Sequence, residues 1–288
     1  MSTALAPTPR QATQECLVEG EFPFTKADFR ALARLLEQDS GIQLVEAKSA
    51  LVYSRLAKRL RLLGLEDFGA YCKLVSRDAK ERAAMLTALT TNVTRFFREP
   101  HHFDHLRKHV LEPKAAAIRA GARLRIWSSA CSSGEEAYSI AMTILGVLPE
   151  AARLNVRVLA TDIDSEVVAT SRAGLYSAAA VEPIPATLKD RYVESTENGR
   201  CTIAADARAL ITFNTLNLMH DWPMKGSFDA IICRNVAIYF SEETQTRLWQ
   251  RFRPLLPEGG RLYVGHSERV GEAGFASDGL TTYKAVRA

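Results

Sequence analysis

The stretch L-R-I-W-S-S-A-C-S-S-G-E-E-A-Y-S-I-A-M, from Leu124 to Met142, decides the fold class. Its first residues form a short apolar run typical of a strand, and its residues from Glu135 onward place apolar side chains at helical spacing. Small residues, from Ser128 to Gly134, separate the two parts. A strand, a turn of small side chains and a helix form a ligand crevice at the carboxyl end of a strand in α/β proteins. The stretch therefore predicts such a crevice.

The two acids that open this helix indicate the charge of the ligand. Glu135 and Glu136 place negative charge where a phosphate-binding helix start is positive. The chain also has neither G-x-G-x-x-G nor G-x-x-x-x-G-K-[ST], the motifs that cradle pyrophosphate and triphosphate groups. We therefore expect a neutral or cationic ligand.

Composition bounds the class of protein without naming a partner. The 288 residues are 47% apolar and 24% charged, which is typical of a globular protein. A formal charge of +4 is slight for this length, so attraction to an acidic partner requires local clusters of Lys and Arg.

Cysteine and histidine usage gives no indication of a metal site or a disulfide framework. The five cysteines stand singly without a C-x-x-C pair, and the six histidines show no repeated metal-ligand spacing. The first residues lack the apolar run of a signal peptide, and no apolar segment reaches the roughly 18 residues that a membrane span needs. We expect no metal, no insertion into a membrane and a cytoplasmic location.

The first third of the chain predicts a small all-helical domain. Residues 1–20 are rich in Ala, Thr, Pro and Gln and are expected to be a disordered lead. Residues 21–90 read as successive helices, the first beginning at Thr25 with Asp28 three positions later. A linker is expected over 91–100; its aromatic and basic residues suggest that it contributes to the site.

The second of these helices carries a basic face formed by four residues: Arg55, Lys58, Arg59 and Arg61. A solvated surface is the plain interpretation. However, no Asp or Glu lies between Lys48 and Leu65, so no acid at i,i+4 spacing compensates the charge. Such a face suits an acidic partner, either a Glu-rich protein helix or nucleic acid.

Alternating strand and helix patterns follow over residues 101–288. This order predicts an α/β domain with a mainly parallel sheet, covered on both faces and closed by an antiparallel edge. Residues 176–214 interrupt the alternation with two prolines, a turn and short strand-like runs, C-T-I and A-L-I-T-F. We expect a small antiparallel β-subdomain inserted there.

Polar residues at expected strand ends outline a nucleoside site. Asp162 ends the second strand, where an acid accepts hydrogen bonds from ribose hydroxyls, and Asp164 is placed to cap the next helix. Asn217 and Leu218 would offer an amide and an apolar wall to adenine.

At the mouth of this crevice we expect Arg234 and Asn235, which end a buried strand. S-adenosylmethionine fits the arrangement: it has a ribose and an adenine, carries a sulfonium and an ammonium group, and lacks phosphate. Glu135 would attract its positive charge.

Six motifs together resemble the bacterial chemotaxis receptor methyltransferases. They are T-N-V-T-R-F-F-R-E (91–99), W-S-S-A-C-S-S-G-E-E-A-Y-S-I-A-M (127–142), A-T-D-I-D-S-E-V (160–167), F-N-T-L-N-L (213–218), F-D-A-I-I-C-R-N-V-A-I-Y-F (228–240) and G-H-S-E (265–268). The similarity covers nearly the whole chain from Phe22 onward.

The resemblance implies a helical domain joined to a Rossmann-like S-adenosylmethionine methyltransferase sheet with a β-subdomain. It implies methylation of glutamate side chains on the cytoplasmic signalling helices of chemoreceptors, with S-adenosylhomocysteine as the product. The cofactor contacts that it implies are Asn92, Thr94, Arg98, Glu135, Asp162, Asn217, Leu218, Arg234 and Asn235. Arg98 and Tyr239 would lie nearest the methyl group and the acceptor carboxylate, and the basic helix would bind the receptor.

One departure concerns recruitment of the receptor. The β-subdomain loop over 194–201 is shorter than in family members that bind a receptor's C-terminal pentapeptide, so tethering in that way is in doubt.

We therefore expect a monomeric protein-glutamate methyltransferase without a nucleic-acid partner. Two alternative functions remain. One is a methyltransferase of nucleic acid or small molecules, motivated by the basic helix. Against it, R-N-V-A-I-Y-F contains no N-P-P-Y-like pair, and the basic face lacks aromatic residues for base stacking. The other is a cofactor-binding module that no longer reacts.

Overall fold

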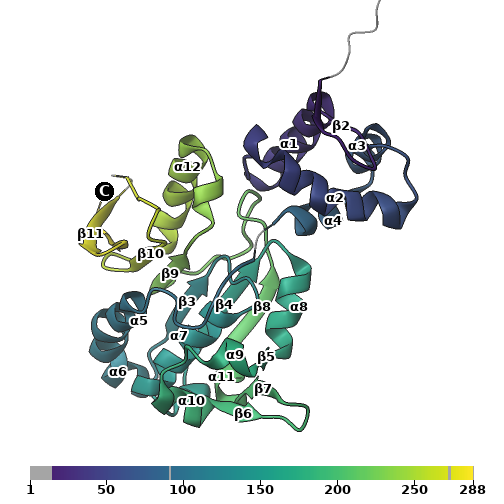
Figure 1. Cartoon of the computed structure of the whole chain (residues 1–288). Coiled ribbons are helices and arrows are strands. Elements are labelled where there is room, and N and C mark those ends of the chain that lie inside the picture. The colour runs from purple at the N-terminus through teal and green to yellow at the C-terminus, as the bar shows by residue number, and fades with distance from the viewer. Residues whose placement is uncertain (1–14, 91, 272–273, 288) are drawn as a thin grey trace, which may run out of the picture. The chain divides into compact units, whose positions relative to one another are not determined.

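The computed structural model describes residues 15–90, 92–271 and 274–287 (Figure 1). Within them the chain forms two compact units, a smaller one of residues 15–39 and 43–89 and a larger one of residues 40–42 and those from 90 onward. The linker expected over 91–100 belongs to the larger unit, apart from Thr91, which lies outside the described residues. No helix in the described part of the chain is long and apolar enough to cross a membrane.

The smaller unit is almost entirely helical, as expected. Its elements are β1 (Cys16–Val18), β2 (Phe24–Thr25), α1 (Lys26–Ser40), a 3-10 turn (Glu46–Lys48), α2 (Ser49–Leu63), α3 (Phe68–Arg77) and α4 (Ala79–Leu89). The Thr25 hydroxyl accepts from the Asp28 N–H, and the Asp28 carboxylate accepts from the Thr25 N–H, so the predicted helix start is confirmed. Gly64 ends α2 in the left-handed conformation, with φ of 64°.

The expected disordered lead needs a correction at its end. Most of it, residues 1–14, lies outside the described residues. Cys16–Val18, however, forms a strand that pairs antiparallel with β2. The backbone hydrogen bonds of that pairing order a segment whose composition alone suggested a lead without structure.

The larger unit is built on a seven-stranded sheet with the order β11-β12-β10-β9-β3-β4-β8. The strands are β3 (Leu124–Ser128), β4 (Val156–Asp162), β8 (Ile211–Thr215), β9 (Ala230–Cys233), β10 (Arg261–Val264), β11 (Phe275–Gly279) and β12 (Thr282–Ala285). The first five in chain order are parallel, and β12 and β11 close one edge in antiparallel fashion. The predicted mainly parallel sheet with an antiparallel edge is confirmed.

Side chains of the sheet enter separate cores on its two faces. In β3, Ile126 belongs to a cluster that contains Tyr138 and Ile140 of α7, whereas Trp127 belongs to a second cluster that contains Phe252 of α12. Successive strand residues point to opposite faces, so both faces are covered. The near-continuous burial of β3, β4 and β9 follows from this layering.

Helices lie between β3 and β4, between β4 and β8 and between β9 and β10 along the chain (Figure 1). The helical elements are α5 (His101–Leu106), a π-helical turn (Arg107–Leu111), α6 (Glu112–Arg119), α7 (Glu135–Val147), a 3-10 turn (Ala151–Arg153), α8 (Ser165–Ala173), α9 (Ala178–Val181), α10 (Ala186–Tyr192), α11 (Ala205–Ala209), η4 (Ala237–Tyr239), α12 (Glu242–Phe252) and η5 (Arg253–Leu255).

The inserted β-subdomain is present but shorter than expected. It is a three-stranded antiparallel sheet with the order β5-β7-β6, formed by β5 (Leu175–Ser177), β6 (Val193–Ser195) and β7 (Arg200–Ile203). The run A-L-I-T-F does not belong to it, because Ile211–Thr215 forms β8 and pairs in parallel with β4. The limit expected near residue 214 is therefore wrong: the chain has returned to the main sheet by Ile211.

Candidate active site

The turn of small residues follows β3, the strand from which the sheet extends to β4 on one side and to β9 on the other. Such a switch point at the carboxyl ends of parallel strands is where open α/β sheets bind ligands. Both neighbouring strands anchor the turn. The Ser129 N–H donates to Ile232 O of β9 at 2.9 Å, and the Cys131 N–H donates to Thr161 O of β4 at 2.9 Å.

Gly134 ends this turn and is the N-cap of α7, and a side chain at this position would be strained. Its φ is 99°, which L side chains rarely adopt. An added Cβ would also lie 2.9 Å from side-chain atoms of Ser171 and Tyr176. The close approach of these neighbours holds the turn against α8 and β5.

Asp162 ends β4, as the sequence predicts, beside the turn of small residues. It is buried, and its carboxylate accepts hydrogen bonds from the Ser132 N–H at 2.8 Å and the Asp164 N–H at 3.1 Å. Burial raises the pKa of this carboxyl, which those backbone donors partly offset. Each carboxylate oxygen has a second lone pair that can accept from a ligand hydroxyl.

Asp164 caps α8 by accepting from the Glu166 N–H at 2.9 Å, which confirms its predicted role. It also holds the linker near the end of β4, because Asn92 donates to Asp164 from Nδ2 at 3.0 Å. The Ser132 hydroxyl in turn donates to Asn92 O at 2.9 Å. Asn92 is thereby fixed between the turn and the end of β4.

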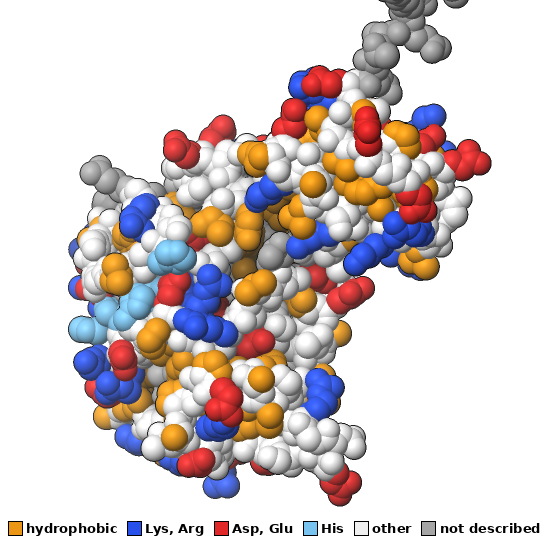
Figure 2. All heavy atoms as spheres, viewed as in Figure 1, with side chains coloured by type: hydrophobic (Ala, Val, Ile, Leu, Met, Phe, Trp, Pro, Cys, Tyr) orange, Lys and Arg blue, Asp and Glu red, His pale blue; other side chains and the backbone are white. Residues whose placement is uncertain are grey.

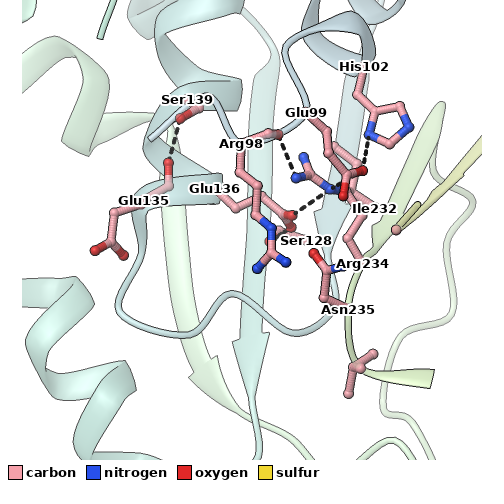
Figure 3. Close-up of polar contacts among 12 residues, drawn as sticks. Arg98, Glu99, His102, Ser128, Glu135, Glu136, Ser139, Ile232, Arg234 and Asn235 are labelled. Atoms are coloured by element: carbon pink, nitrogen blue, oxygen red, sulfur yellow. Dashed lines mark hydrogen bonds and ion pairs between the residues drawn. The ribbon is translucent and has the colours of Figure 1, made fainter. Parts of the chain in front are cut away.

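Arg234 occupies the centre of a buried charge cluster (Figure 3). Its Nε lies 3.6 Å from Glu136 Oε2 and 3.7 Å from Glu99 Oε2, and its Nη2 donates to Arg98 O at 2.5 Å. Burial raises the pKa of Glu136, an effect that the Arg234 charge opposes. Arg234 was expected to contact a ligand directly; the structure places its guanidinium against two acids and the backbone of Arg98.

A small cavity of about 20 Å³ adjoins this cluster. Its lining includes four residues expected at the site: Thr94, Arg98, Arg234 and Asn235. These residues come from the linker and from the end of β9, segments more than 130 positions apart in sequence. The fold therefore brings together the two polar segments that the sequence singled out.

One group of described residues has donor atoms spaced closely enough for a metal ion. Glu99, His101 and His102 place one ligand atom each within 4.8 Å of one another. The Arg234 guanidinium already supplies positive charge beside Glu99. Burial lowers the pKa of His102 to about 3, so this imidazole is neutral at physiological pH.

Comparison with known proteins gives the family. The family model described as "CheR methyltransferase, SAM binding domain" matches residues 92–282, and "CheR methyltransferase, all-alpha domain" matches residues 27–90. The chain belongs to the CheR methyltransferase family. It is an S-adenosylmethionine-dependent methyltransferase, and the resemblance seen in its motifs is confirmed.

Relatives support this family over most of the chain. A probable chemotaxis protein methyltransferase of Rhizobium etli is 53% identical over 258 residues, covering 87% of this chain and 96% of the relative. The chemotaxis protein methyltransferase of Escherichia coli is 40% identical over 265 residues, covering 89% and 90%. A solved structure, TrmN from Thermus thermophilus, is far more distant, with a TM-score of 0.35 and 17% identity over 60% of this chain and 48% of that one.

Glu135 of this CheR-family methyltransferase is a buried acid in the first turn of α7. Glu135 is 8% exposed, accepts a hydrogen bond from the Ser133 hydroxyl at 2.7 Å, and has no cationic partner among the described residues. Burial raises its pKa because the charged form loses hydration there.

Asn217 and Leu218 lie on the loop after β8, and Arg251 of α12 holds this loop. The Arg251 guanidinium donates to Leu218 O at 2.6 Å and to His220 O. It also stacks on Trp222 at 4.0 Å from the ring centroid. Sequence reasoning missed Arg251, because a cation on an amphipathic helix gives no sign that it binds carbonyls 31 and 33 residues away.

Tyr239 ends the 3-10 helix η4 and is half-buried. The segment before it is fixed by Glu268, whose buried carboxylate accepts from the Ala237 N–H at 2.7 Å. Sequence reasoning quoted Glu268 in G-H-S-E but gave it no role. No local signal indicated a role for it, because its N–H partners in this segment lie 30 to 33 residues earlier in the chain.

The basic residues of α2 are not the uncompensated face that was expected. Arg59 forms two hydrogen bonds with Glu81 of α4, at 3.0 and 2.6 Å, and Arg61 pairs with Glu21 at 2.7 Å. The Arg55 guanidinium donates to Leu89 O at 2.9 Å. The expectation failed because these partners lie outside the helix, where an i,i+4 search does not reach. Lys58 is exposed.

Proposed function

We propose that this methyltransferase transfers the methyl group of S-adenosylmethionine to glutamate side chains on chemoreceptor signalling helices. It would do so as a monomer in the cytoplasm and without a nucleic-acid partner. The observation that carries the proposal is a stripe on α2 of the smaller unit, defined by exposed Leu51, Lys58 and Leu62 and by half-buried Arg55, whose guanidinium also donates to Leu89 O.

The four residues of the stripe share one face of α2. Spacings of four, three and four residues return to nearly the same direction at 100° per residue. Leu51 is 44% exposed and Leu62 is 72% exposed, so apolar side chains flank the basic ones. Figure 2 shows Lys and Arg side chains beside hydrophobic ones over α2.

A surface that mixes leucine with cations matches an amphipathic helix rich in glutamate. Apolar contacts would be buried while the cations face carboxylates. Nucleic acid would be matched instead by cations with interleaved aromatic residues. The stripe therefore favours a protein helix as the substrate.

The chemistry requires no general base. A glutamate with the ordinary pKa near 4.3 is ionised at neutral pH, so its oxygen attacks the sulfonium methyl group directly. The protein must align oxygen, methyl carbon and sulfur, and must replace the water around the carboxylate.

The crevice residues divide these tasks in our proposal. Asp162 would accept from the ribose hydroxyls and Glu135 would face the ammonium group, while the turn lets the backbone approach the cofactor. The Asn217 amide and the Leu218 side chain would border the adenine.

Arg98 and Tyr239 are the residues proposed nearest the reaction. The Arg98 side chain donates to Val93 O at 3.1 Å, which leaves further guanidinium donors for a carboxylate of the cofactor or the substrate. Tyr239 would shape the path of the methyl group. The proposal predicts that Arg98→Ala weakens cofactor binding or slows turnover, and unchanged values of both would contradict it.

Labelled S-adenosylmethionine tests the acceptor. The protein is incubated with a chemoreceptor signalling fragment or with RNA, and the products are treated with alkali. Carboxyl methyl esters release methanol, whereas N-methyl groups stay attached. We expect alkali-labile label on the receptor fragment; label that survives alkali or appears only on RNA contradicts the proposal.

A second measurement tests the stripe. Lys58→Glu should raise the KM for the receptor fragment about tenfold through charge repulsion while leaving the dissociation constant for S-adenosylmethionine unchanged. Lys73→Glu on α3, an exposed lysine away from α2, is the matched control and should leave both constants unchanged. Equal effects of the two substitutions would remove the stripe from the proposal.

A further inference from the structure

Glu268 is the most elaborately hydrogen-bonded buried acid in the described part of the chain. It is 2% exposed and belongs to none of the ion pairs among those residues. Its carboxylate instead accepts from backbone N–H groups of Asn235 (2.8 Å), Val236 (3.0 Å), Ala237 (2.7 Å), Ile238 (3.3 Å) and Gly265 (2.5 Å). Amide dipoles thus stabilise this charge in place of a cation.

The backbone around Asn235 is shaped to present these donors. Asn235 has φ of 59°, in the left-handed region, and Val236 is right-handed with φ of −119° and ψ of −41°. Residues of opposite hand in succession make neighbouring N–H groups converge on an anion. Asparagine enters the left-handed region more readily than most non-glycine residues, and the carboxylate fixes Asn235 in this conformation through its N–H.

Gly265 permits the close approach of the two segments. A Cβ at this position would lie 2.4 Å from Asn235 Nδ2 and 2.8 Å from Glu268 Oε2. No side chain fits between the Glu268 carboxylate and the Asn235 segment. In the G-H-S-E motif, Gly265 leaves space for the Glu268 carboxylate, and this carboxylate binds the Asn235 segment.

The sheet itself is fixed without this carboxylate. β9 and β10 pair from Ala230 to Cys233 and from Arg261 to Val264, before the Asn235 segment and the Glu268 loop begin. The hydrogen bonds of Glu268 therefore act on the segment Asn235–Tyr239, which carries the proposed cofactor contact Asn235 and the proposed reaction-centre residue Tyr239.

We propose that Glu268 is a positioning residue for methyl transfer: its carboxylate holds the segment Asn235–Tyr239 so that Tyr239 lies correctly at the reaction centre. This inference rests on the proposed function for the part played by Tyr239. Glu268 itself does not touch the reacting atoms; it acts through the backbone of η4.

Glu268→Gln tests the inference with little change of shape. One carboxylate oxygen becomes an NH₂ group, which turns a donor toward N–H groups that need an acceptor. We expect kcat at saturating cofactor and receptor fragment to fall at least about tenfold, since misplacement of a reacting group by about 1 Å can cost a hundredfold. Amide hydrogen exchange should accelerate selectively in peptides that cover residues 235–238.

Coupling to Tyr239 separates positioning from general support of the fold. Once the segment is displaced, Tyr239→Phe should add little, so the double variant should lose less activity than the product of the single losses. Ile118→Ala on α6 is the control for stability: it should lower Tm and leave kcat unchanged, because Ile118 is buried away from this segment. If Glu268→Gln does not fold, Glu268→Asp, which keeps both acceptor oxygens on a shorter stem, is measured in the same way.

The outcomes decide the inference. A folded variant with kcat within twofold of wild type, losses that multiply with Tyr239→Phe, or unchanged exchange at residues 235–238 would each overturn it. The exchange measurement uses neither cofactor nor receptor. A wild-type protein that fails to methylate the receptor fragment would contradict the proposed function, while the exchange result would still report on Glu268.

Discussion

Removing the Arg59 guanidinium should destabilise the smaller unit without affecting the cofactor site. Arg59 donates two hydrogen bonds to the Glu81 carboxylate, and Tyr71 donates to the same carboxylate at 3.0 Å. Burial and the Glu81 charge raise the pKa of Tyr71 well above its ordinary value, so this hydroxyl keeps its proton and stays a donor. Arg59→Ala would leave Glu81 buried with Tyr71 alone.

The magnitude follows from the exposure of the two partners. Breaking a fully buried ion pair costs about 3–5 kcal/mol. The Glu81 side chain is 8% exposed, but that of Arg59 is 26% exposed, and one hydrogen bond to Glu81 survives. We therefore expect a loss of about 2–3 kcal/mol in the free energy of unfolding of the smaller unit.

The assay must report on the smaller unit alone. All three tryptophans, Trp127, Trp222 and Trp249, lie in the larger unit, so their fluorescence does not detect this unfolding. Hydrogen exchange in peptides from α2 and α4 of the full chain does. Lys58→Ala is the matched control on the same helix and should change stability by less than about 0.5 kcal/mol.

A change for Arg59→Ala as small as that of the control would refute the reasoning, as would a loss confined to the tryptophan-bearing unit. The result also affects receptor assays. Arg59→Glu would place two carboxylates together in a buried position, so weak methylation by that variant would reflect unfolding. Lys58 is the residue of this face suited to charge reversal.

Three further predictions concern the larger unit. Glu135→Gln should weaken S-adenosylmethionine binding roughly tenfold. Burial raises the pKa of Glu135, so the affinity of the wild-type protein, measured by calorimetry, should fall as the pH is lowered toward that pKa. The Glu135→Gln variant should lack this pH dependence. The pKa of His102 is about 3 in the folded state, so as the pH falls this imidazole is protonated in the unfolded chain before it is protonated in the folded one. The free energy of unfolding should therefore decrease below pH about 6.5, by about 2 kcal/mol at pH 5. Urea unfolding of His102→Gln should show a smaller decrease over the same pH range. Gly134→Ala should lower stability by about 2 kcal/mol or more because of its positive φ and close neighbours, whereas Gly146→Ala within α7, where a Cβ meets only an ordinary contact, should be neutral or stabilising in thermal unfolding.

Short sequence motifs correctly predicted helix starts and caps, because these features are formed by residues close together in the sequence. The start of α1 at Thr25 and Asp28 and the cap of α8 at Asp164 depend on residues within three positions of one another. The assignment of Ile211–Thr215 failed because a short apolar run looks the same in either sheet. Its partner, β4, lies about 50 residues earlier and is chosen by packing that periodicity does not encode.

The chemical types of the candidate site residues could be predicted from the sequence, but the residues that hold them in place were harder to predict. Strand-end residues such as Asp162 follow from the rule that parallel strands gather their carboxyl ends at one edge. The partners of Arg59, 22 residues away, and of Glu268, 30 to 33 residues away along η4, do not follow from spacing on one helix or strand. Buried charged groups pair with groups that are close in the folded structure, whatever their separation in the sequence.

In the proposed cofactor site, the anchoring of the turn after β3 also determines how much of the backbone must reorder when the cofactor is exchanged. The Ser171 hydroxyl donates to Ser132 O at 2.9 Å and the Tyr176 hydroxyl donates to Ser133 O at 2.7 Å, in addition to the bonds from β4 and β9. Ordering a backbone costs about 1–2 kcal/mol per residue in entropy, and here that ordering is complete when the chain folds. The enzyme can therefore release its product and accept a new methyl donor without rebuilding this surface in each catalytic cycle.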